Sequence, residues 1–108
     1  MNITNQDWKL FRQRLPGWQE AYMDRLNKEY ADILFGEGQP SEKFWALENR
    51  IREDRRRPGV QLRISRSTML HSLILLLHDG VITTDDLEGF SDDVKKSAHM
   101  FLNLNQEK

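Results

Sequence analysis

Seven arginines lie between positions 50 and 66, and no lysine or histidine interrupts them. Only Glu53 and Asp54 oppose them within this segment. The planar guanidinium group of arginine contacts a phosphate or carboxylate through two parallel hydrogen bonds, whereas lysine offers a point charge. The segment is therefore the strongest candidate in the sequence for contact with an acidic protein surface or a nucleic acid. With an adjacent tryptophan, the candidate surface comprises Arg52, Arg55, Arg56, Arg57, Arg63, Arg66 and Trp45.

The net charge of −1 conceals this segment. Residues 1–49 carry a balance of −2, residues 50–66 of +5 and residues 67–108 of −4. Two interpretations stay open. The arginines can solubilise a helix end and pair with the chain's own carboxylates, as most charge runs do, or they can face a protein or nucleic-acid partner. No RRM signature, C₂H₂ spacing or GxxG loop supports nucleic-acid binding.

Metal chemistry finds little support in the sequence. His71 and His78 lie seven residues apart and could approach His99 or Asp79, but this spacing is not that of a standard zinc site. An EF-hand with Gly80 at its sixth position would place leucines at the first and third, where calcium needs oxygen ligands. We therefore predict no metal and no other cofactor.

Catalytic patterns are equally weak. The acidic residues between 85 and 93 lie where helices are expected to begin, so helix capping explains them better than acid–base catalysis does. No cysteine is present, the serines lie in no nucleophile elbow or SxxK pattern, and there is no P-loop or dinucleotide fingerprint. The sequence predicts that the protein is not an enzyme, and it indicates no small-molecule substrate.

The elements that would hold these residues are helical. Apolar spacings of three and four residues, together with capping residues and breakers, predict helices over about 4–15, 16–35, 41–57, 66–78, 83–90 and 91–102. Pro16 is expected to end or kink the first helix, and Gly80 to end the fourth in a left-handed conformation. Residues 60–64 alternate apolar and polar side chains, which is typical of an extended connector or a marginal strand.

These elements predict an all-α fold, a single compact bundle of five to six short helices. The 108 residues suit a single domain, 1–108, with a tail at 103–108 that frays. Trp8 and Trp18 fall on apolar stripes and are expected in the core, whereas Trp45 lies beside its stripe and is expected to be exposed. The longest apolar run is too short to span a membrane, and no secretory leader is evident, so we expect a cytoplasmic protein.

Two resemblances bear on function. Residues 75–87 resemble the helical hairpin of short bacterial oligomerisation domains of the SHOCT type, which implies a helix-mediated interaction. The runs at 11–22, 57–62 and 78–90 together resemble a group of small uncharacterised helical proteins of gut Firmicutes and their mobile elements. That resemblance implies a bacterial accessory protein and transfers no catalytic or binding residue.

The sequence therefore favours a small bacterial cytoplasmic module that is not catalytic and acts through protein contacts or in regulation. Self-association is compatible with this expectation. The alternative is an accessory protein that binds nucleic acid through the basic segment Arg50 to Arg66.

Overall fold

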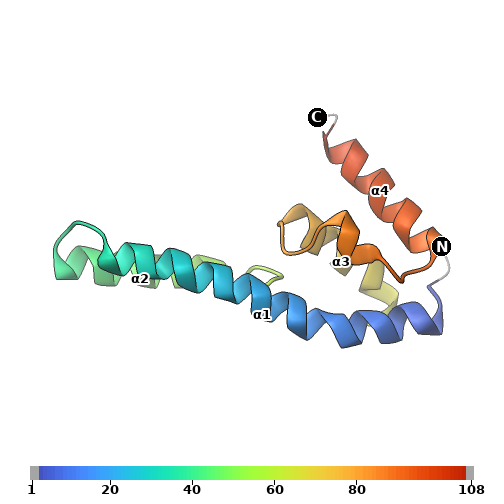
Figure 1. The fold of residues 1–108 in the computed structure, drawn as a ribbon, viewed down its shortest axis with the longest axis horizontal. Coiled ribbons are helices and arrows are strands. Elements are labelled where there is room, and N and C mark those ends of the chain that lie inside the picture. Colours follow the sequence, from blue (N-terminus) through green and yellow to red (C-terminus); the bar gives the residue numbers. More distant parts are fainter. Residues whose placement is uncertain (1–2, 107–108) are drawn as a thin grey trace.

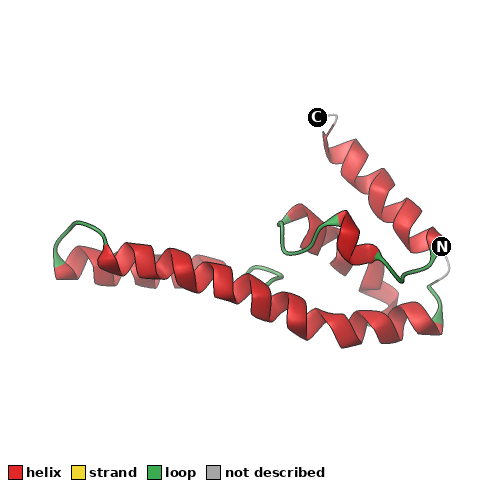
Figure 2. Cartoon of the chain, viewed as in Figure 1, coloured by secondary structure: helices red, strands yellow, loops and turns green. Residues whose placement is uncertain are grey.

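Residues 3–106 fold into four α-helices with two short 3₁₀ helices between them. The computed structural model describes residues 3–106 and the side chains of residues 3–103. The elements in order are α1 (Asn5–Phe35), α2 (Pro40–Asp54), η1 (Arg66–Thr68), α3 (Met69–His78), η2 (Thr84–Leu87) and α4 (Asp92–Gln106). No strand occurs among residues 3–106, so the predicted all-α class is confirmed (Figure 2). The predicted count of five to six helices is wrong, because there are four α-helices.

The difference in count has two sources. The helix predicted over 83–90 is the short 3₁₀ helix η2, and Pro16 lies inside α1 rather than at its end. A proline in a helix interior removes one hydrogen bond and costs about 3 kcal/mol. The ring of Pro16 points to solvent, while Phe11 and Leu15 before it and Tyr22 after it are buried. The packing of buried residues before and after Pro16 thus outweighs the free-energy cost of placing a proline inside the helix. The helix bends in its N-terminal part and then continues as one element (Figure 1).

An extended arm projects from a packed head, so the predicted compact bundle is also wrong in shape (Figure 1). The arm is the hairpin of α2 and residues 19–35 of α1; the head contains residues 3–18, α3, η2 and α4. The molecule measures 53 × 32 × 21 Å, and its radius of gyration is 16.7 Å. A globular domain of about this length would have a radius of gyration of about 13 Å. The loop at 36–39, at the end of the arm far from the head, turns α2 back along α1 toward the head (Figure 1).

The largest cluster of buried hydrophobic side chains lies in the head, and Tyr22 and Leu26 of the arm are buried outside it. Met69, Leu73 and Leu76 of α3 are fully buried at the centre of this cluster, as expected for the most apolar helix of the sequence. Trp8 and Trp18 are half-buried against this core. The other core residues are Phe11, Leu15, Leu77, Ile82, Leu87, Phe90, Val94 and Ala98. Because few hydrophobic side chains are buried in the arm, polar interactions have to help hold its two helices together.

Residues 55–65 return the chain from the arm to the head. They form turns followed by irregular backbone, so the connector predicted at 60–64 is present and the alternative of a strand there is wrong. Leu62 and Ile64 are half-buried against the head core. Further along, Gly80 ends α3 with a φ of 73°, as predicted. Helix α4 continues to Gln106, beyond residue 103 where fraying was expected; residues 107 and 108 lie outside the described part.

Candidate functional site

One side of the arm is polar and centred on Asp54, whose side chain is almost fully buried. Asp54 accepts hydrogen bonds from the Tyr30 hydroxyl at 2.6 Å, from Arg57 Nε at 3.2 Å and from Arg50 Nε at 3.4 Å. Burial and the hydrogen bond to Asp54 raise the pKa of Tyr30 to about 12. This cluster therefore joins α1 to α2 through hydrogen-bonded polar groups, at a place where apolar packing would ordinarily join two helices.

Arg57 extends the cluster to the head. Its Nη1 donates to Asp79 Oδ1 at 2.9 Å, at the C-terminal end of α3. The charge of Asp79 is the main reason that the pKa of Arg57 lies above its ordinary value. On the same side, Arg50 donates to Glu29 at 3.0 Å. The arm is thus tied both within itself and to the head by arginine–carboxylate pairs.

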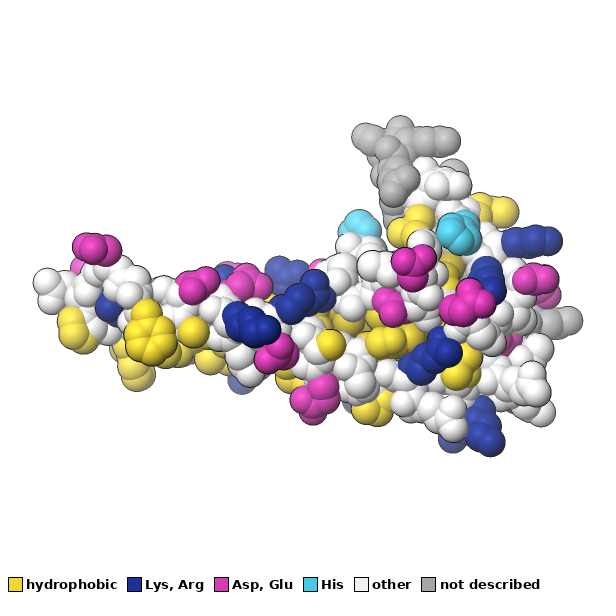
Figure 3. All heavy atoms as spheres, viewed as in Figure 1, with side chains coloured by type: hydrophobic (Ala, Val, Ile, Leu, Met, Phe, Trp, Pro, Cys, Tyr) yellow, Lys and Arg dark blue, Asp and Glu magenta, His cyan; other side chains and the backbone are white. Residues whose placement is uncertain are grey.

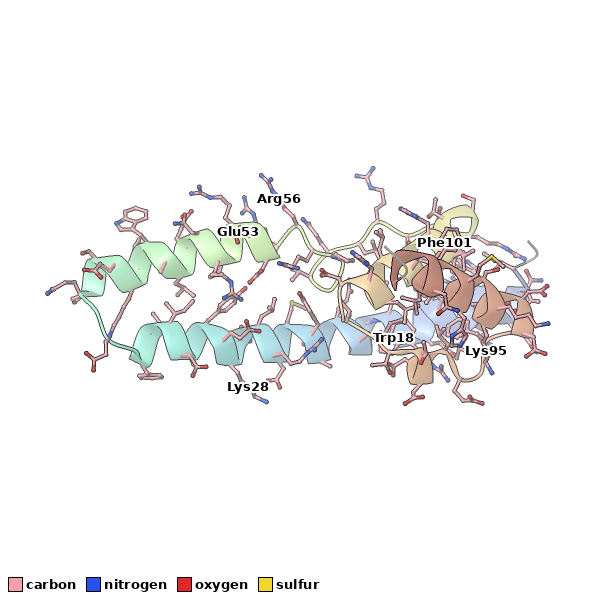
Figure 4. All side chains as sticks on the ribbon, turned by 90° about the horizontal axis from the view of Figure 1, so that it is seen from above. Trp18, Lys28, Glu53, Arg56, Lys95 and Phe101 are labelled. Atoms are coloured by element: carbon pink, nitrogen blue, oxygen red, sulfur yellow. The ribbon has the colours of Figure 1, made fainter. Side chains whose placement is uncertain are left out.

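The predicted arginine surface is divided by the fold. Three of its members bond within the chain: Arg57 as described, Arg52 to Glu48, and Arg66 to the carbonyl oxygen of Ile3 at 2.9 Å. The side chains of the remaining three arginines make no hydrogen bond or ion pair within the described part of the chain and are exposed; they are Arg55, Arg56 and Arg63. Arg56 extends from the end of α2 on the side away from α1 (Figure 4). Pairing within the chain therefore accounts for three of the six arginines of the predicted surface.

The other side of the arm is apolar. Residues three, four or seven apart on α1 and α2 put one stripe of hydrophobic side chains on each helix. We call this surface the apolar face, and it comprises Met23, Leu34, Phe44, Leu47, Ile51 and Val60. Leu26 and Tyr30 line the space between the two helices beside it. Phe44 is 62% exposed, Leu34 45% and Ile51 43%. In the space-filling view, hydrophobic side chains gather along the lower edge of the arm and charged ones crowd its upper part (Figure 3).

The apolar face is hollowed in two places. One concavity of about 320 Å³ lies on α2 and is lined by Phe44, Leu47, Glu48, Ile51, Arg52 and Arg55. A second, of about 290 Å³, lies between the helices and is lined by Met23, Leu26, Asn27, Tyr30, Ile51, Arg55 and Val60. Both are lined by Ile51 and Arg55, so they adjoin. We call the pair the groove.

Aromatic side chains flank the groove at the far end of the arm. Trp45 is 59% exposed, as predicted, and packs edge-on against the ring of Phe44 with centroids 5.0 Å apart. Phe35, at the end of α1, is the most exposed large hydrophobic residue, at 88%. Both lie beside the loop that joins α1 to α2. The tip of the arm therefore presents aromatic rings to solvent.

The spacing of Phe44, Leu47 and Ile51 puts them on one apolar stripe, but it did not show that Phe44 and Ile51 would be exposed. The periodicity of a stripe shows only that its residues share a face. One feature of the sequence could have predicted this exposure. A short break at 36–40 joins two amphipathic helices into a hairpin, and two helices by themselves cover only the sides that face each other.

The remaining candidates do not come together. His71, His78 and His99 are exposed, and no group of three or more histidine, aspartate or glutamate side chains in the described part of the chain could hold a metal ion. Within the same residues, no helix has both the length and the apolar character needed to cross a membrane.

Comparison with known proteins found no matching family model, no matching curated protein and no matching solved structure. The resemblance to small helical proteins of gut Firmicutes stays a prediction.

Proposed function

We propose that this chain is a non-catalytic protein-interaction module of the bacterial cytoplasm, and that the apolar face of the arm is its contact surface. The exposure of Phe44, Ile51 and Leu34 on one face carries the proposal. Contiguous apolar surface of this kind is uncommon on monomers and marks interaction sites. Large side chains such as these each gain about 1.5–3 kcal/mol when they are withdrawn from water.

The chemistry at the edges of the face suits a protein partner. Interface energy concentrates in tryptophan, tyrosine and arginine, which combine a large apolar area with a polar group. Here Trp45 adjoins Phe44, and Arg55 lines the groove with no partner of its own in the described part of the chain. The apolar centre thus offers affinity, and the arginine offers selectivity for a carboxylate on the partner.

Site-specific photocrosslinking in cells tests this function. Phe44→benzoylphenylalanine places the reactive group on the apolar face, and Lys28→benzoylphenylalanine places it on the opposite side of the arm, where Lys28 points away from α2 (Figure 4). We expect a discrete crosslinked product from position 44 that disappears when Ile51→Glu is added, and none from position 28. No product from position 44, or equal products from both positions, would contradict the proposal.

A second candidate function is binding of nucleic-acid phosphates, favoured by the guanidinium groups of Arg55, Arg56 and Arg63, which have no partner among the described residues. Phosphate contacts release counterions, so such binding weakens steeply as salt rises. Fluorescence anisotropy with a random-sequence duplex at low and high salt measures this. Absence of binding at low salt excludes this function and leaves the protein-interaction proposal untouched.

A further inference from the structure

The apolar face is complementary to itself, and from this we infer that its partner is a second copy of the chain. The two copies pack their arms antiparallel about a two-fold axis that passes near Ile51, and Phe44 of each copy enters the groove of the other. This inference rests on the proposed function, because it names the partner of the same surface. Its evidence lies in the arrangement of a protruding ring, a cavity and two charges on that surface.

The ring and the cavity lie on opposite sides of Ile51. Phe44 precedes Ile51 by seven residues, or about 10 Å along α2, and its ring is 62% exposed. The cavity of about 290 Å³ extends from Ile51 in the opposite direction, toward Arg55 and Val60. A two-fold rotation about Ile51 exchanges these ends, so each ring faces the other copy's cavity. Such self-complementary contact is what a two-fold dimer requires.

Charged side chains of the groove are also placed so that the two-fold rotation brings opposite charges together. Glu48 lies three residues before Ile51 and Arg55 four residues after it, and both line the groove. Glu48 already pairs with Arg52 of its own chain, which also lines the groove. The rotation brings Glu48 of each copy next to Arg55 of the other, which makes two equivalent further ion pairs beside the central Ile51 contact. Arg55 has no partner within the described part of its own chain. Opposite charges in this arrangement favour the antiparallel orientation over the parallel one, which would bring like charges together.

The architecture of the arm supports the same partner. A helical hairpin has a single layer, and its apolar side needs a second layer to be covered. The head lies at one end of the arm and leaves this side open (Figures 1 and 3). Two arms packed by their apolar faces form a four-helix bundle, in which the exposed side chains of each copy become core. The polar cluster around Asp54 remains on the outside.

The oligomeric state tests the inference directly. Sedimentation equilibrium of the full chain over a range from 1 μM to 1 mM should show a monomer–dimer equilibrium. Ile51→Glu should shift the midpoint at least tenfold toward higher concentration. Asn49→Glu is the matched control, because it adds the same charge to an exposed position of α2 outside the groove, and it should leave the midpoint unchanged. Circular dichroism establishes that each variant keeps its helix content.

A charge exchange tests the antiparallel arrangement without altering the apolar contacts. Glu48→Arg and Arg55→Glu alone should each weaken the dimer at least tenfold, because each places like charges together twice. An equimolar mixture of the two variants should form a heterodimer of near wild-type affinity, since both pairs are then attractive: Arg55 of the first variant faces Glu48 of the second, and the substituted arginine at position 48 faces the substituted glutamate at position 55. The double variant should likewise dimerise. A dimer that is indifferent to these changes would overturn the arrangement.

The outcomes separate this inference from the proposed function. A chain that stays monomeric to 1 mM, yet crosslinks from position 44 to a different protein, overturns self-association and retains the interaction module. A product of twice the chain's mass from position 44, lost with Ile51→Glu, supports both. A monomer with no crosslinked product overturns both.

Discussion

Ser91 donates two hydrogen bonds to the carboxylate of Asp7, from its backbone N to Oδ1 and from its hydroxyl to Oδ2, each 2.8 Å long. Asp7 also accepts from the backbone N of Thr4 at 3.1 Å, which completes the capping box of α1. Ser91 in turn precedes α4, and its hydroxyl lies 3.5 Å from the backbone N of Val94. A single buried carboxylate therefore joins the beginnings of two helices that are distant in the sequence.

Asp7→Asn should lower the free energy of unfolding at pH 7 by roughly 2–4 kcal/mol, because it weakens hydrogen bonds to a buried charge at two helix starts. Urea denaturation followed by circular dichroism measures the change. Asp24→Asn, which alters an exposed carboxylate of α1, is the control and should cost well under 1 kcal/mol. Equal losses in the two variants would contradict the role of Asp7.

The same carboxylate predicts a loss of stability in acid. Burial alone would raise the pKa of Asp7, but hydrogen bonds from Ser91 and Thr4 lower it below the ordinary value of 3.8. A lowered native pKa means that the stabilisation is complete above pH 3.8 and is lost as the pH falls below that value. Between pH 5 and pH 2 the wild type should therefore lose more stability than Asp7→Asn. Parallel curves for the two proteins would count against this account.

The hydroxyl of Tyr30 should lose its proton at a higher pH than that of an ordinary tyrosine. Its pKa of about 12 arises from burial and from its hydrogen bond to Asp54, both of which disfavour the phenolate. Because the native pKa is raised, the stabilisation is complete below the ordinary pKa of 10.0 and is lost as the pH rises from 10.0 toward 12. Absorbance at 295 nm in a Tyr22→Phe background isolates Tyr30, since the chain has two tyrosines. A midpoint near 10 would contradict the Tyr30–Asp54 contact.

Gly59 and Gly17 should respond oppositely to alanine. A Cβ on Gly59 would lie 2.2 Å from Cδ2 of the buried Tyr22 ring, so Gly59→Ala should destabilise the fold by about 1–3 kcal/mol. A Cβ on Gly17 meets nothing within 4 Å in α1, so Gly17→Ala should stabilise it by up to about 1 kcal/mol. Thermal or urea denaturation compares the pair. A neutral Gly59→Ala would show that the connector does not pack closely on α1.

Arg57 and Arg56 form a matched pair for the junction of arm and head. Arg57→Gln removes the contacts to Asp54 and Asp79 and should cost about 1–2 kcal/mol. Arg56→Gln removes the same charge from an exposed position and should change stability by less than about 0.5 kcal/mol. Urea denaturation distinguishes them. If both variants unfold alike, the polar cluster does not hold the arm to the head.

Local features were readable from residue type and spacing. The all-α class and the left-handed Gly80 each depend on chemistry within a few residues, and the structure confirms them. The exposure of Trp45 also followed from its place beside an apolar stripe. In each case the deciding interaction lies within one or two helical turns.

Interactions between distant segments decided the rest. The sequence could not show that Pro16 would be carried inside α1, because the packing of Phe11 and Tyr22 on either side outweighs its local cost. Nor could it show which arginines would pair, since Arg57 reaches Asp79 only once the connector returns the chain to the head.

The amphipathic stripe that contains Phe44 and Ile51 was determined by the sequence alone. Its exposure was decided by the fold, because α2 turns back along the arm and the head covers only the other end of α1. The physical reason is that side-chain period specifies which residues share a face, whereas burial depends on what the rest of the chain, or a second copy, places against that face.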